Sequence, residues 1–554
     1  CGVCRSKGGC IVSARFRPSL DRRNLATFIL AWAFLNFFIN FDFPAAPLLS
    51  FKLLRPSLEV WGLLGVLCAL AWFGRAARAR VILPLMALLV FGRLFRLGDV
   101  IMPVYFNRPF NLYMDIGYLP GLAHLLANSF SPVRLTLYAA LTAVLVAALV
   151  WALWRALQTA GAFFRYPAAR YGFAGVSLVL ALAVGAYQSG RYPAHLPPPA
   201  TAFTPRLAAE VAFMVNIREI RRRGLAAVQM AAERIPAYEA PLAGLRGRNV
   251  YLFLIESYGQ TLFKKPEHWQ TFAPSIQWLA ATLNRGGYTI YSRYLRSPTF
   301  GGASWLAFGT LESGVWLSDQ LRYAYLVASR VPPLASYFAR AGYRTLSIMP
   351  GTTMPWPEGR YFGYQREYHA RDLDYRGPAF GFAPMPDQFV LDRIYRREIM
   401  PHEGPLFIRY VLVSTHAPFH RQPAYLPDWE LVGDGSVYHQ LAPVEFPNNW
   451  PDLTEATEAY LTAIRYELTV LGHYLTRFAH DDALIIVLGD HQPNAHITGS
   501  EAPSLVPMHV ICRDASVLAP FRQMGFTPGV VPDDKPPFGS MQDFLPDLLA
   551  AFSR

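Results

Sequence analysis

Cysteine is scarce in this sequence, and its placement limits how the protein can be stabilised. Of five cysteines, Cys1, Cys4 and Cys10 lie at the N-terminus, and Cys68 lies in an apolar run. Cys512 is alone in the C-terminal half, which excludes a disulfide within that half. An exported domain without disulfides must be stabilised by its hydrophobic core, and about 300 residues are enough to form one. Cys1-x-x-Cys4 resembles half a zinc site, but no second pair accompanies it, so we interpret it as accidental.

The C-terminal half also lacks a basic stripe interleaved with aromatic residues, the pattern by which a soluble domain binds nucleic acid. The formal net charge is +13, but the excess of Lys and Arg lies in residues 1–245, because residues 246–554 hold more acidic than basic side chains. We therefore expect no nucleic-acid partner. Hydrophobic residues make up 53% of the chain and are concentrated early, which predicts a membrane segment followed by a soluble part.

Long apolar runs dominate the first 190 residues. A helix needs ~20 mainly apolar residues to cross a bilayer. The segment Asn111–Phe130 is mixed and amphipathic, with Asp115 inside it, so we expect an interfacial or re-entrant helix there and not a further crossing. The candidate spans are Leu25–Phe43, Val60–Phe73, Val81–Phe95, Leu135–Leu153 and Tyr171–Tyr187.

The basic residues that flank these spans predict the orientation, because short cytoplasmic loops are enriched in Lys and Arg. Five alternating crossings place the N-terminal segment, the turn after the second span and the loop after the fourth span on one side. We therefore expect the N-terminus inside and everything after Tyr187 outside, with the first span directing export in place of a cleavable signal peptide. The basic residues concerned are Arg5, Lys7, Arg15, Arg17, Arg22, Arg23, Arg75, Arg78, Arg80, Arg155, Arg165 and Arg170.

Two segments follow the last span. The Pro-rich stretch Tyr192–Ala200 cannot continue a helix. Next, Pro205–Ile235 has a helical pattern in which Arg218 and Arg221–Arg223 are grouped. This basic face fits either a juxtamembrane helix near anionic headgroups or an ordinary solvated surface, and both interpretations stay open.

From Arg246 onward, short apolar runs alternate with helical patterns, which predicts an α/β domain with a mainly parallel central sheet covered on both faces. The predicted organisation is a transmembrane anchor at 1–190, a linker with a juxtamembrane helix at 191–245, and an extracytoplasmic domain at 246–554. Expected strands are Asn249–Ile255, Arg344–Ile348, Leu406–Val413, Leu484–Leu488 and Met508–Cys512, the last followed by Arg513-Asp514. Expected helices are Pro274–Asn284, Pro332–Ala341, Pro386–Ile399, Leu453–Phe478 and Met541–Phe552.

Chemically useful side chains follow three of these strands. Glu256 follows the first strand, His416 the third, and Asp490-His491 the fourth. Ligands of open α/β sheets bind outside the carboxyl ends of the strands, so we expect these side chains to converge. Glu256, Asp490 and His491 supply two hard oxygens and one imidazole, a set suited to zinc or manganese that lacks a fourth ligand.

Ser304 is the candidate for that fourth ligand and for a nucleophile. It follows Gly301-Gly302, which permits a tight turn, and it opens a helical pattern. A hydroxyl at a helix N-terminus lies in the positive end of the helix dipole, which favours phosphate oxygens, and a bound metal would activate it. The simpler alternative is that Ser304 is only a helix N-cap.

These residues stand in four motifs that together resemble those of the sulfatase-like transferases of the alkaline-phosphatase superfamily. That group includes lipoteichoic acid synthase and the phosphoglycerol and phosphoethanolamine transferases. The resemblance extends from about Arg246 to the end of the sequence and also fits an anchor of about five transmembrane helices. The motifs are Asn249-Val-Tyr-Leu-Phe-Leu-Ile-Glu256-Ser, Gly301-Gly-Ala-Ser304, Ser414-Thr-His-Ala-Pro-Phe419 and Val487-Leu-Gly-Asp-His491-Gln-Pro493.

The resemblance implies roles for individual positions. Glu256, Asp490 and His491 match the family's ligands to one divalent metal ion, zinc or manganese. Ser304 stands where most relatives have a threonine that is both nucleophile and metal ligand, and Thr299, before the glycines, remains its rival. His416 matches a histidine that contacts the transferred phosphoryl group. Trp356 and Arg360 resemble the substrate-contacting Trp and Arg of lipoteichoic acid synthase, with a shorter spacing.

The implied activity is metal-dependent transfer of a phosphoglycerol or phosphoethanolamine headgroup from a phospholipid donor to an envelope glycan or lipid. The implied location is the bacterial cytoplasmic membrane, with the catalytic domain on the periplasmic side. A sulfatase-like or phosphodiesterase hydrolase and a non-catalytic membrane receptor or scaffold remain alternatives. Formylglycine sulfatases need Cys or Ser followed by x-Pro-x-Arg, whereas Ser297-Pro298 has its proline one position too early, so sulfate-ester hydrolysis is the less favoured chemistry.

Overall fold

A computed structural model describes residues 20–42, 55–75, 78–121, 123, 132–192, 201–447, 456–479, 482–499 and 501–554. The three N-terminal cysteines, the basic residues before Leu20, most of the Pro-rich stretch, and residues 124–130 of the expected interfacial helix lie outside this part. The chain forms two compact units. The first comprises Cys1–Val100 and Pro132–Ala209, and the second comprises Ile101–Ser131 and Glu210–Arg554.

The first unit is built from apolar helices, and each of the five expected spans falls on one of them. Among the described residues, α3, α6 and α7 are long and apolar enough to cross a membrane. Helix α2 is apolar but has 14 residues, about 21 Å of rise, which is shorter than a ~30 Å hydrocarbon core. The count of five crossings therefore remains a prediction. The helices are α1 (Arg22–Asn40), α2 (Leu58–Ala71), α3 (Ala79–Phe106), α6 (Pro132–Phe163) and α7 (Pro167–Gln188).

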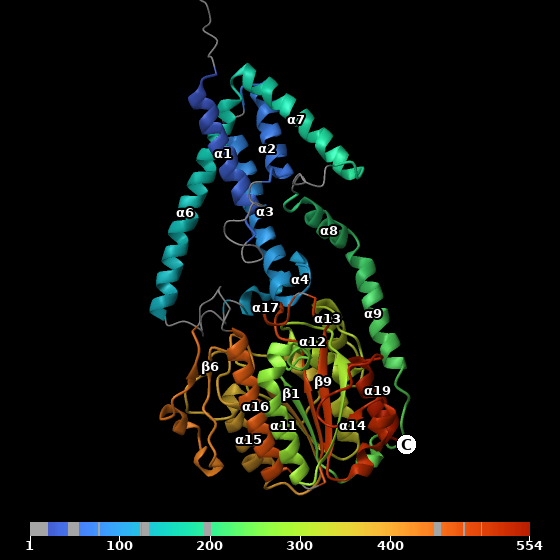
Figure 1. Cartoon of the computed structure of the whole chain (residues 1–554). Coiled ribbons are helices and arrows are strands. Elements are labelled where there is room, and N and C mark those ends of the chain that lie inside the picture. The colour runs from blue at the N-terminus through green and yellow to red at the C-terminus, as the bar shows by residue number, and fades with distance from the viewer. Residues whose placement is uncertain are drawn as a thin grey trace, which may run out of the picture. The chain divides into compact units, whose positions relative to one another are not determined.

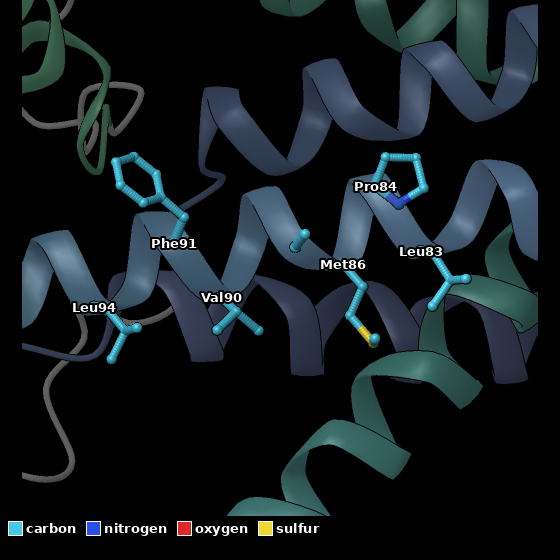
Figure 2. A pocket seen from close by; sticks show the side chains of 7 residues that line it. Leu83, Pro84, Met86, Val90, Phe91 and Leu94 are labelled. Atoms are coloured by element: carbon cyan, nitrogen blue, oxygen red, sulfur yellow. The ribbon is translucent and has the colours of Figure 1, made fainter.

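A shallow apolar hollow lies along α3 (Figure 2). Its lining comes from this one helix and contains no charged or hydrogen-bonding side chain. A surface of this composition, on a helix long enough to cross a membrane, suits lipid chains and offers no group for catalysis. The lining residues are Leu83, Pro84, Met86, Ala87, Val90, Phe91 and Leu94.

The segment expected to form one helix at Pro205–Ile235 is instead two helices, α8 (Thr204–Val215) and α9 (Ile217–Glu233), separated at Asn216. In α9, Glu219 forms ion pairs with Arg222 and Arg223 on an exposed face. Between α3 and α6, the expected interfacial helix begins with α4 (Leu112–Asp115) and a 3₁₀ turn, Ile116–Tyr118. Asp115 is buried and paired with Arg108 at 2.6 Å.

The second unit contains one nine-stranded sheet in its described part. The strand order is β10-β2-β9-β8-β1-β5-β3-β4, and β11 pairs with β2. Strands β8, β1, β5, β3 and β4 are parallel, which confirms the predicted α/β class with a mainly parallel sheet. The strands are β1 (Val250–Ile255), β2 (Thr289–Arg296), β3 (Arg344–Met349), β4 (Arg366–His369), β5 (Leu406–Leu412), β8 (Leu484–Gly489), β9 (Leu505–Cys512), β10 (Thr527–Pro528) and β11 (Gly539–Ser540).

Two features of the sheet differ from the expectation. Strand β9 runs antiparallel to β8, so Arg513 and Asp514 lie at the opposite edge from the residues that follow β1, β5 and β8. Strands β2 and β4 were not predicted, because their mixed Tyr, Arg, Ser and Glu content lacks an apolar run. In β2 the buried side chains largely alternate with half-exposed ones, as expected for a strand with one face partly exposed to solvent.

Helices cover both faces of the sheet, and β1 shows why (Figure 1). Tyr251, Phe253 and Ile255 pack into the core beneath α11, α15 and α16, whereas Val250, Leu252 and Leu254 pack into the core beneath α12, α14 and α19. Every residue of β1 is buried because successive side chains point to opposite faces. The helices are α11 (Pro266–Arg285), α12 (Ser304–Ser313), α14 (Leu334–Arg340), α15 (Asp387–Ile394), α16 (Ala456–Phe478) and α19 (Met541–Phe552).

Candidate active site

Three neighbouring parallel strands end side by side and carry the predicted site residues. Ile255, at the end of β1, is in register with Leu412 of β5 and Gly489 of β8. Glu256 and Asp490 therefore emerge next to each other, and the loop after β5 brings His416 to the same edge. The strand order 8-1-5 places residues from three distant sequence segments within contact distance.

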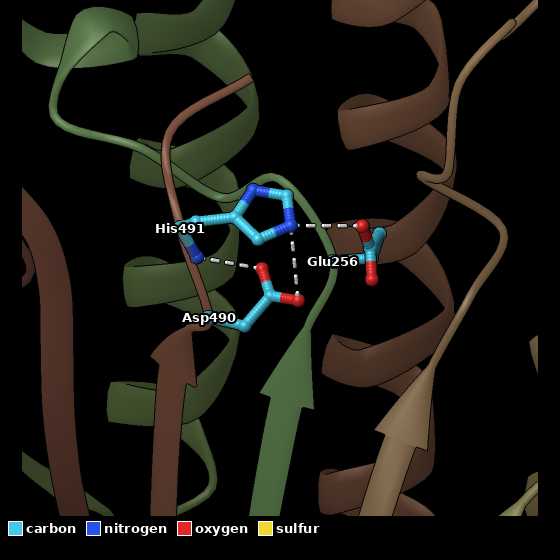
Figure 3. A group of neighbouring side chains, drawn as sticks. All are labelled: Glu256, Asp490 and His491. Carbon is cyan, nitrogen blue, oxygen red and sulfur yellow. Dashed lines mark hydrogen bonds and ion pairs between the residues drawn. The ribbon is translucent and has the colours of Figure 1, made fainter. Parts of the chain in front are cut away.

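Glu256, Asp490 and His491 form a compact, buried group, with one potential ligand atom of each within 4.8 Å of the others (Figure 3). Nε2 of His491 lies 3.1 Å from Oε1 of Glu256 and 3.5 Å from Oδ2 of Asp490. Backbone groups hold the other polar side-chain atoms of Asp490 and His491 in place. The amides of Ser257 and His491 donate to Oδ1 of Asp490 at 2.9 and 2.7 Å, and Nδ1 of His491 lies 2.8 Å from the carbonyl of Gln492. Oδ2 of Asp490 and Nε2 of His491 are thereby left facing the group.

The hydroxyl of Ser304 completes this group. Its Oγ donates to Oε2 of Glu256 at 3.0 Å and lies 3.1 Å from Nε2 of His491. Ser304 is the first residue of α12, and the N-cap position is occupied by Ala303, which has no capping side chain. The simpler alternative, a serine N-cap, therefore does not describe its geometry.

The turn before Ser304 explains how a helix N-terminus reaches the strand ends. Gly301, Gly302 and Ala303 all have positive φ values (67°, 150° and 60°). The N–H of Gly301 donates to the carbonyl of Gln492 at 3.0 Å, which ties the turn to the segment after β8. Glycine tolerates such angles without a Cβ clash, so the glycine pair makes this approach possible.

Thr299 and His416 lie differently from Ser304. The hydroxyl of Thr299 donates to the carbonyl of Gly302 and so braces the turn. His416 lies at the rim: its Nε2 is 4.0 Å from Oε1 of Glu256, and its ring stacks on Phe382 with centroids 3.6 Å apart. This half-buried imidazole is near the group but outside its closest contacts.

Trp356 and Arg360 are not brought into this group. Trp356 stacks on Phe362 with ring centroids 5.4 Å apart, and the side chain of Arg360 is exposed. Within the described part of the chain, no hydrogen bond, ion pair or ring contact joins either residue to Glu256, Asp490 or His491. Their assignment to substrate binding remains a prediction.

Burial and neighbouring charges shift the pKa values of all three residues of this group. Burial alone would raise the pKa of Glu256, but the positive charges of His416 and His491 lower it to about 2. Burial and the neighbouring charge of Glu256 raise the pKa of Asp490 to about 8. Burial would lower the pKa of His491, but the carboxylates of Asp490 and Glu256 raise it to about 9. Near neutral pH, Glu256 is therefore ionised, whereas Asp490 and His491 both hold a proton.

The donor set fits a divalent metal ion. Oδ2 of Asp490 is buried without a hydrogen-bond partner, which is costly unless a cation or proton occupies the position it faces. Two carboxylates, one imidazole and one hydroxyl supply the four ligands of a zinc-like site, and manganese accepts the same oxygen and nitrogen donors.

Several supporting residues were missed at the sequence level. Thr415 and Ser297 donate their hydroxyls to the carbonyls of Glu256 and Asp490, each at 2.6 Å, and so fix the two strand ends. The position of Thr415 inside the Ser-Thr-His motif could have suggested its role. The ring of Tyr118, in contrast, lies 5.8 Å from that of Trp305, beside Ser304, and no local pattern predicts this contact.

Comparisons with known proteins agree with this architecture. Residues 310–508 match the family model described as Sulfatase, a segment that contains His416, Asp490 and His491 but begins after Glu256 and Ser304. No curated protein matches the chain. The C-terminal half thus contains a segment similar to the sulfatases, in a chain that also carries apolar helices long enough to span a membrane.

The solved structures that are similar to the chain at low identity include the following three. The lipoteichoic acid synthase of Listeria monocytogenes has 14% identity and a TM-score of 0.37, covering 58% of this chain and 77% of that one. The integral membrane lipooligosaccharide phosphoethanolamine transferase of Neisseria meningitidis has 12% identity and a TM-score of 0.44, covering 95% and 99%. The zinc complex of the C-terminal periplasmic domain of EptC from Escherichia coli has 16% identity and a TM-score of 0.33, covering 50% and 76%.

Proposed function

We propose that this protein is a metal-dependent transferase of the membrane surface. It moves a phosphoglycerol or phosphoethanolamine headgroup from a phospholipid to a hydroxyl of an envelope glycan or lipid, through an ester on Ser304. The observation that carries the proposal is the position of the Ser304 hydroxyl, 3.0 Å from Glu256 and 3.1 Å from His491, at the start of a helix. A nucleophile placed there faces both the ligand group and the free backbone N–H groups of α12.

Glu256, Ser304, Asp490 and His491 are the residues that would hold the ion, zinc or manganese. When bound, such an ion lowers the pKa of a coordinated hydroxyl and offsets negative charge on phosphoryl oxygens. The chain's own contribution is to hold four donors rigidly in a buried site, so that little reorganisation is needed during the reaction.

The first step makes the enzyme ester. The Ser304 hydroxyl gives up its proton to solvent water, its Oγ forms a bond to the phosphorus of the donor, and the bond from phosphorus to the diacylglycerol oxygen breaks; the same ionised Oγ is the group that leaves in the second step. His416, at the rim of the site, donates a proton to that leaving oxygen. The products are diacylglycerol and a phosphoryl-headgroup ester on Ser304.

The second step regenerates the serine. An acceptor hydroxyl gives its proton to His416 and attacks the phosphorus, and the bond to Oγ of Ser304 breaks. Water in place of the acceptor would give a hydrolase with the same intermediate, which is the alternative that the sulfatase match favours. Membrane-spanning helices support the transferase reading, because they keep the chain at the bilayer where phospholipid donors are abundant.

The full-length protein in vesicles of phosphatidylglycerol or phosphatidylethanolamine tests the proposal. We expect metal-dependent release of diacylglycerol and, by mass spectrometry, a headgroup phosphoryl mass added to the peptide that contains Ser304. Free phosphoglycerol or phosphoethanolamine as the end product, even with glycan acceptors present, would identify a hydrolase. Metal-loaded protein that neither releases diacylglycerol nor forms the adduct would contradict both activities and favour the receptor alternative.

A further inference from the structure

The loop that carries His416 is held by hydrogen bonds on two sides. On one side, the hydroxyl of Thr415 donates to the carbonyl of Glu256. On the other, Ser414 and Asp387 bond reciprocally: the N–H of Ser414 donates to Oδ2 of Asp387 at 2.6 Å, and the N–H of Asp387 donates to Oγ of Ser414 at 3.1 Å. The position of the loop therefore depends on the carboxyl group of Asp387.

Asp387 is the first residue of α15, where the positive end of the helix dipole favours a carboxylate. Its side chain is fully buried, and its second oxygen, Oδ1, has no hydrogen-bond donor. An ionised carboxylate with an unsatisfied oxygen in a protein core is costly, so another group must supply a hydrogen.

Glu467 of α16, which forms a side-chain hydrogen bond with Asp387, is the group that can do so. It is also fully buried, and neither of its oxygens has a hydrogen-bond donor. Among the described residues, no Lys, Arg or His forms an ion pair with either carboxyl group. Two facing carboxylates without a cation cannot both be ionised in a core, and one shared proton satisfies both.

The electrostatics agree with this geometry. Burial, together with the charge of Asp387, holds the pKa of Glu467 well above its usual range. Burial also raises the pKa of Asp387, to about 6, although hydrogen bonds from Ser414 and Glu467 lower it. At neutral pH the proton therefore resides on Glu467, which donates it to Asp387.

We infer that Asp387 and Glu467 are positioning residues, which act through one shared proton to hold Ser414 and, two residues later, the His416 imidazole at the rim of the active site. The importance of this placement for turnover rests on the proposed function of His416. Two apolar side chains would fill the same core without the desolvation cost of two carboxyl groups. Asp387 and Glu467 therefore contribute more to the placement of His416 than to the stability of the fold.

A matched pair of variants at Glu467 tests the shared proton in the full-length protein. Glu467→Gln keeps a hydrogen-bond donor facing Asp387, whereas Glu467→Met keeps the volume and removes the donor. We expect kcat of Glu467→Gln to stay within about twofold of wild type and kcat of Glu467→Met to fall about tenfold. The kcat of Asp387→Ala should fall about 10²-fold, because this variant also removes the carboxylate oxygen that accepts from the N–H of Ser414. In all three variants, metal content and KM for the lipid donor should match wild type.

The reactivity of His416 gives a second readout that does not depend on turnover. The rate at which diethyl pyrocarbonate modifies His416, followed by mass spectrometry, should change at least twofold in Asp387→Ala and Glu467→Met but not in Glu467→Gln. This measurement still tests whether Asp387 and Glu467 position His416 if the wild-type protein shows no transferase or hydrolase activity. If Asp387→Ala fails to fold, the two Glu467 variants decide the question.

Two outcomes would overturn the inference. Wild-type kcat and wild-type His416 reactivity in both Glu467→Met and Asp387→Ala would show that the pair does not hold the loop. Equal losses in Glu467→Gln and Glu467→Met would show that the pair needs two carboxylates, as a cation site would, and not one shared proton.

Discussion

Oγ of Ser304 lies 3.1 Å from Nε2 of His491, although 187 residues separate them in the chain. The contact is produced by a helix that begins at the edge of the sheet where β8 ends. Because the same hydroxyl also donates to Glu256, Ser304 lies where a fourth metal ligand and a nucleophile would both have to be. The first prediction concerns this residue.

Ser304→Ala should lower transfer on the order of 10⁴-fold or more, because no other hydroxyl lies within hydrogen-bond distance of both Glu256 and His491 in the described structure. Ser304→Thr should keep substantial activity, since it keeps the hydroxyl. Thr299→Ala is the matched control and should have a smaller effect, because the Thr299 hydroxyl braces the turn at Gly302. Rates of diacylglycerol release measure all three. An active Ser304→Ala with an inactive Thr299→Ala would reverse the assignment of the nucleophile.

Metal affinity should rise with pH. The pKa values of Asp490 and His491 are raised to about 8 and about 9, so near neutral pH the metal-free group holds protons that a cation must displace. Each displaced proton should raise the apparent affinity about tenfold per pH unit below these values. Glu256, with its pKa at about 2, is already ionised and releases no proton. Zinc titrations between about pH 6 and about pH 8 would show this trend, and a flat profile would contradict the proposed ligand set.

Gly301→Ala should disturb the nucleophile turn. A Cβ at this position would collide with the backbone carbonyl of Tyr105 and lie 3.1 Å from Cα of Asn494, with φ at +67°. A displacement of Ser304 of about 1 Å would cost about 10²-fold in kcat. Gly287→Ala is the matched control: its φ is +82°, but nothing lies within 4 Å of the new Cβ. Gly287→Ala should therefore cost only stability, about 1–2 kcal/mol, and leave kcat unchanged.

Arg409→Met should strongly destabilise the C-terminal domain. Arg409 in β5 and Glu312 in α12 form an ion pair at 2.5 Å, and both side chains are fully buried. Removing the cation leaves a buried carboxylate, at a cost of about 3–5 kcal/mol. Combining it with Glu312→Leu should restore most of the loss, because neither charge then remains. Denaturant unfolding of the detergent-solubilised protein measures both, and a double variant no more stable than Arg409→Met would refute the explanation.

The five-crossing topology predicts opposite locations for two loops. A reporter fused after Arg80 should report the cytoplasmic side, and one fused after Pro205 the outer side, because three spans lie between them. Helix α2, the shortest of the five with 14 residues, lies before both fusion sites, so its failure to cross would exchange the two sides. Reports from the same side at both sites would show that one of the intervening helices does not cross.

Much of the fold and part of the site follow from local sequence. The apolar runs of β1, β3, β5 and β8 begin and end within one residue of their predicted bounds, because a strand buried on both faces is mostly apolar along its length. Helix α19 has the bounds that its pattern predicts, Met541–Phe552. Strand β2 was missed because one of its faces is partly exposed and its composition is therefore mixed.

By itself, the sequence determined the order of the motifs, the α/β class and the residue types available for a metal site. Only the tertiary structure decided that Ser304 meets Glu256 and His491, that β9 runs antiparallel, and that Asp387 faces Glu467. The physical reason is that residue type, period and capping are local properties of the chain. Strand order, helix docking and the pairing of buried charges arise from packing between segments far apart in sequence, and no local pattern encodes those distances.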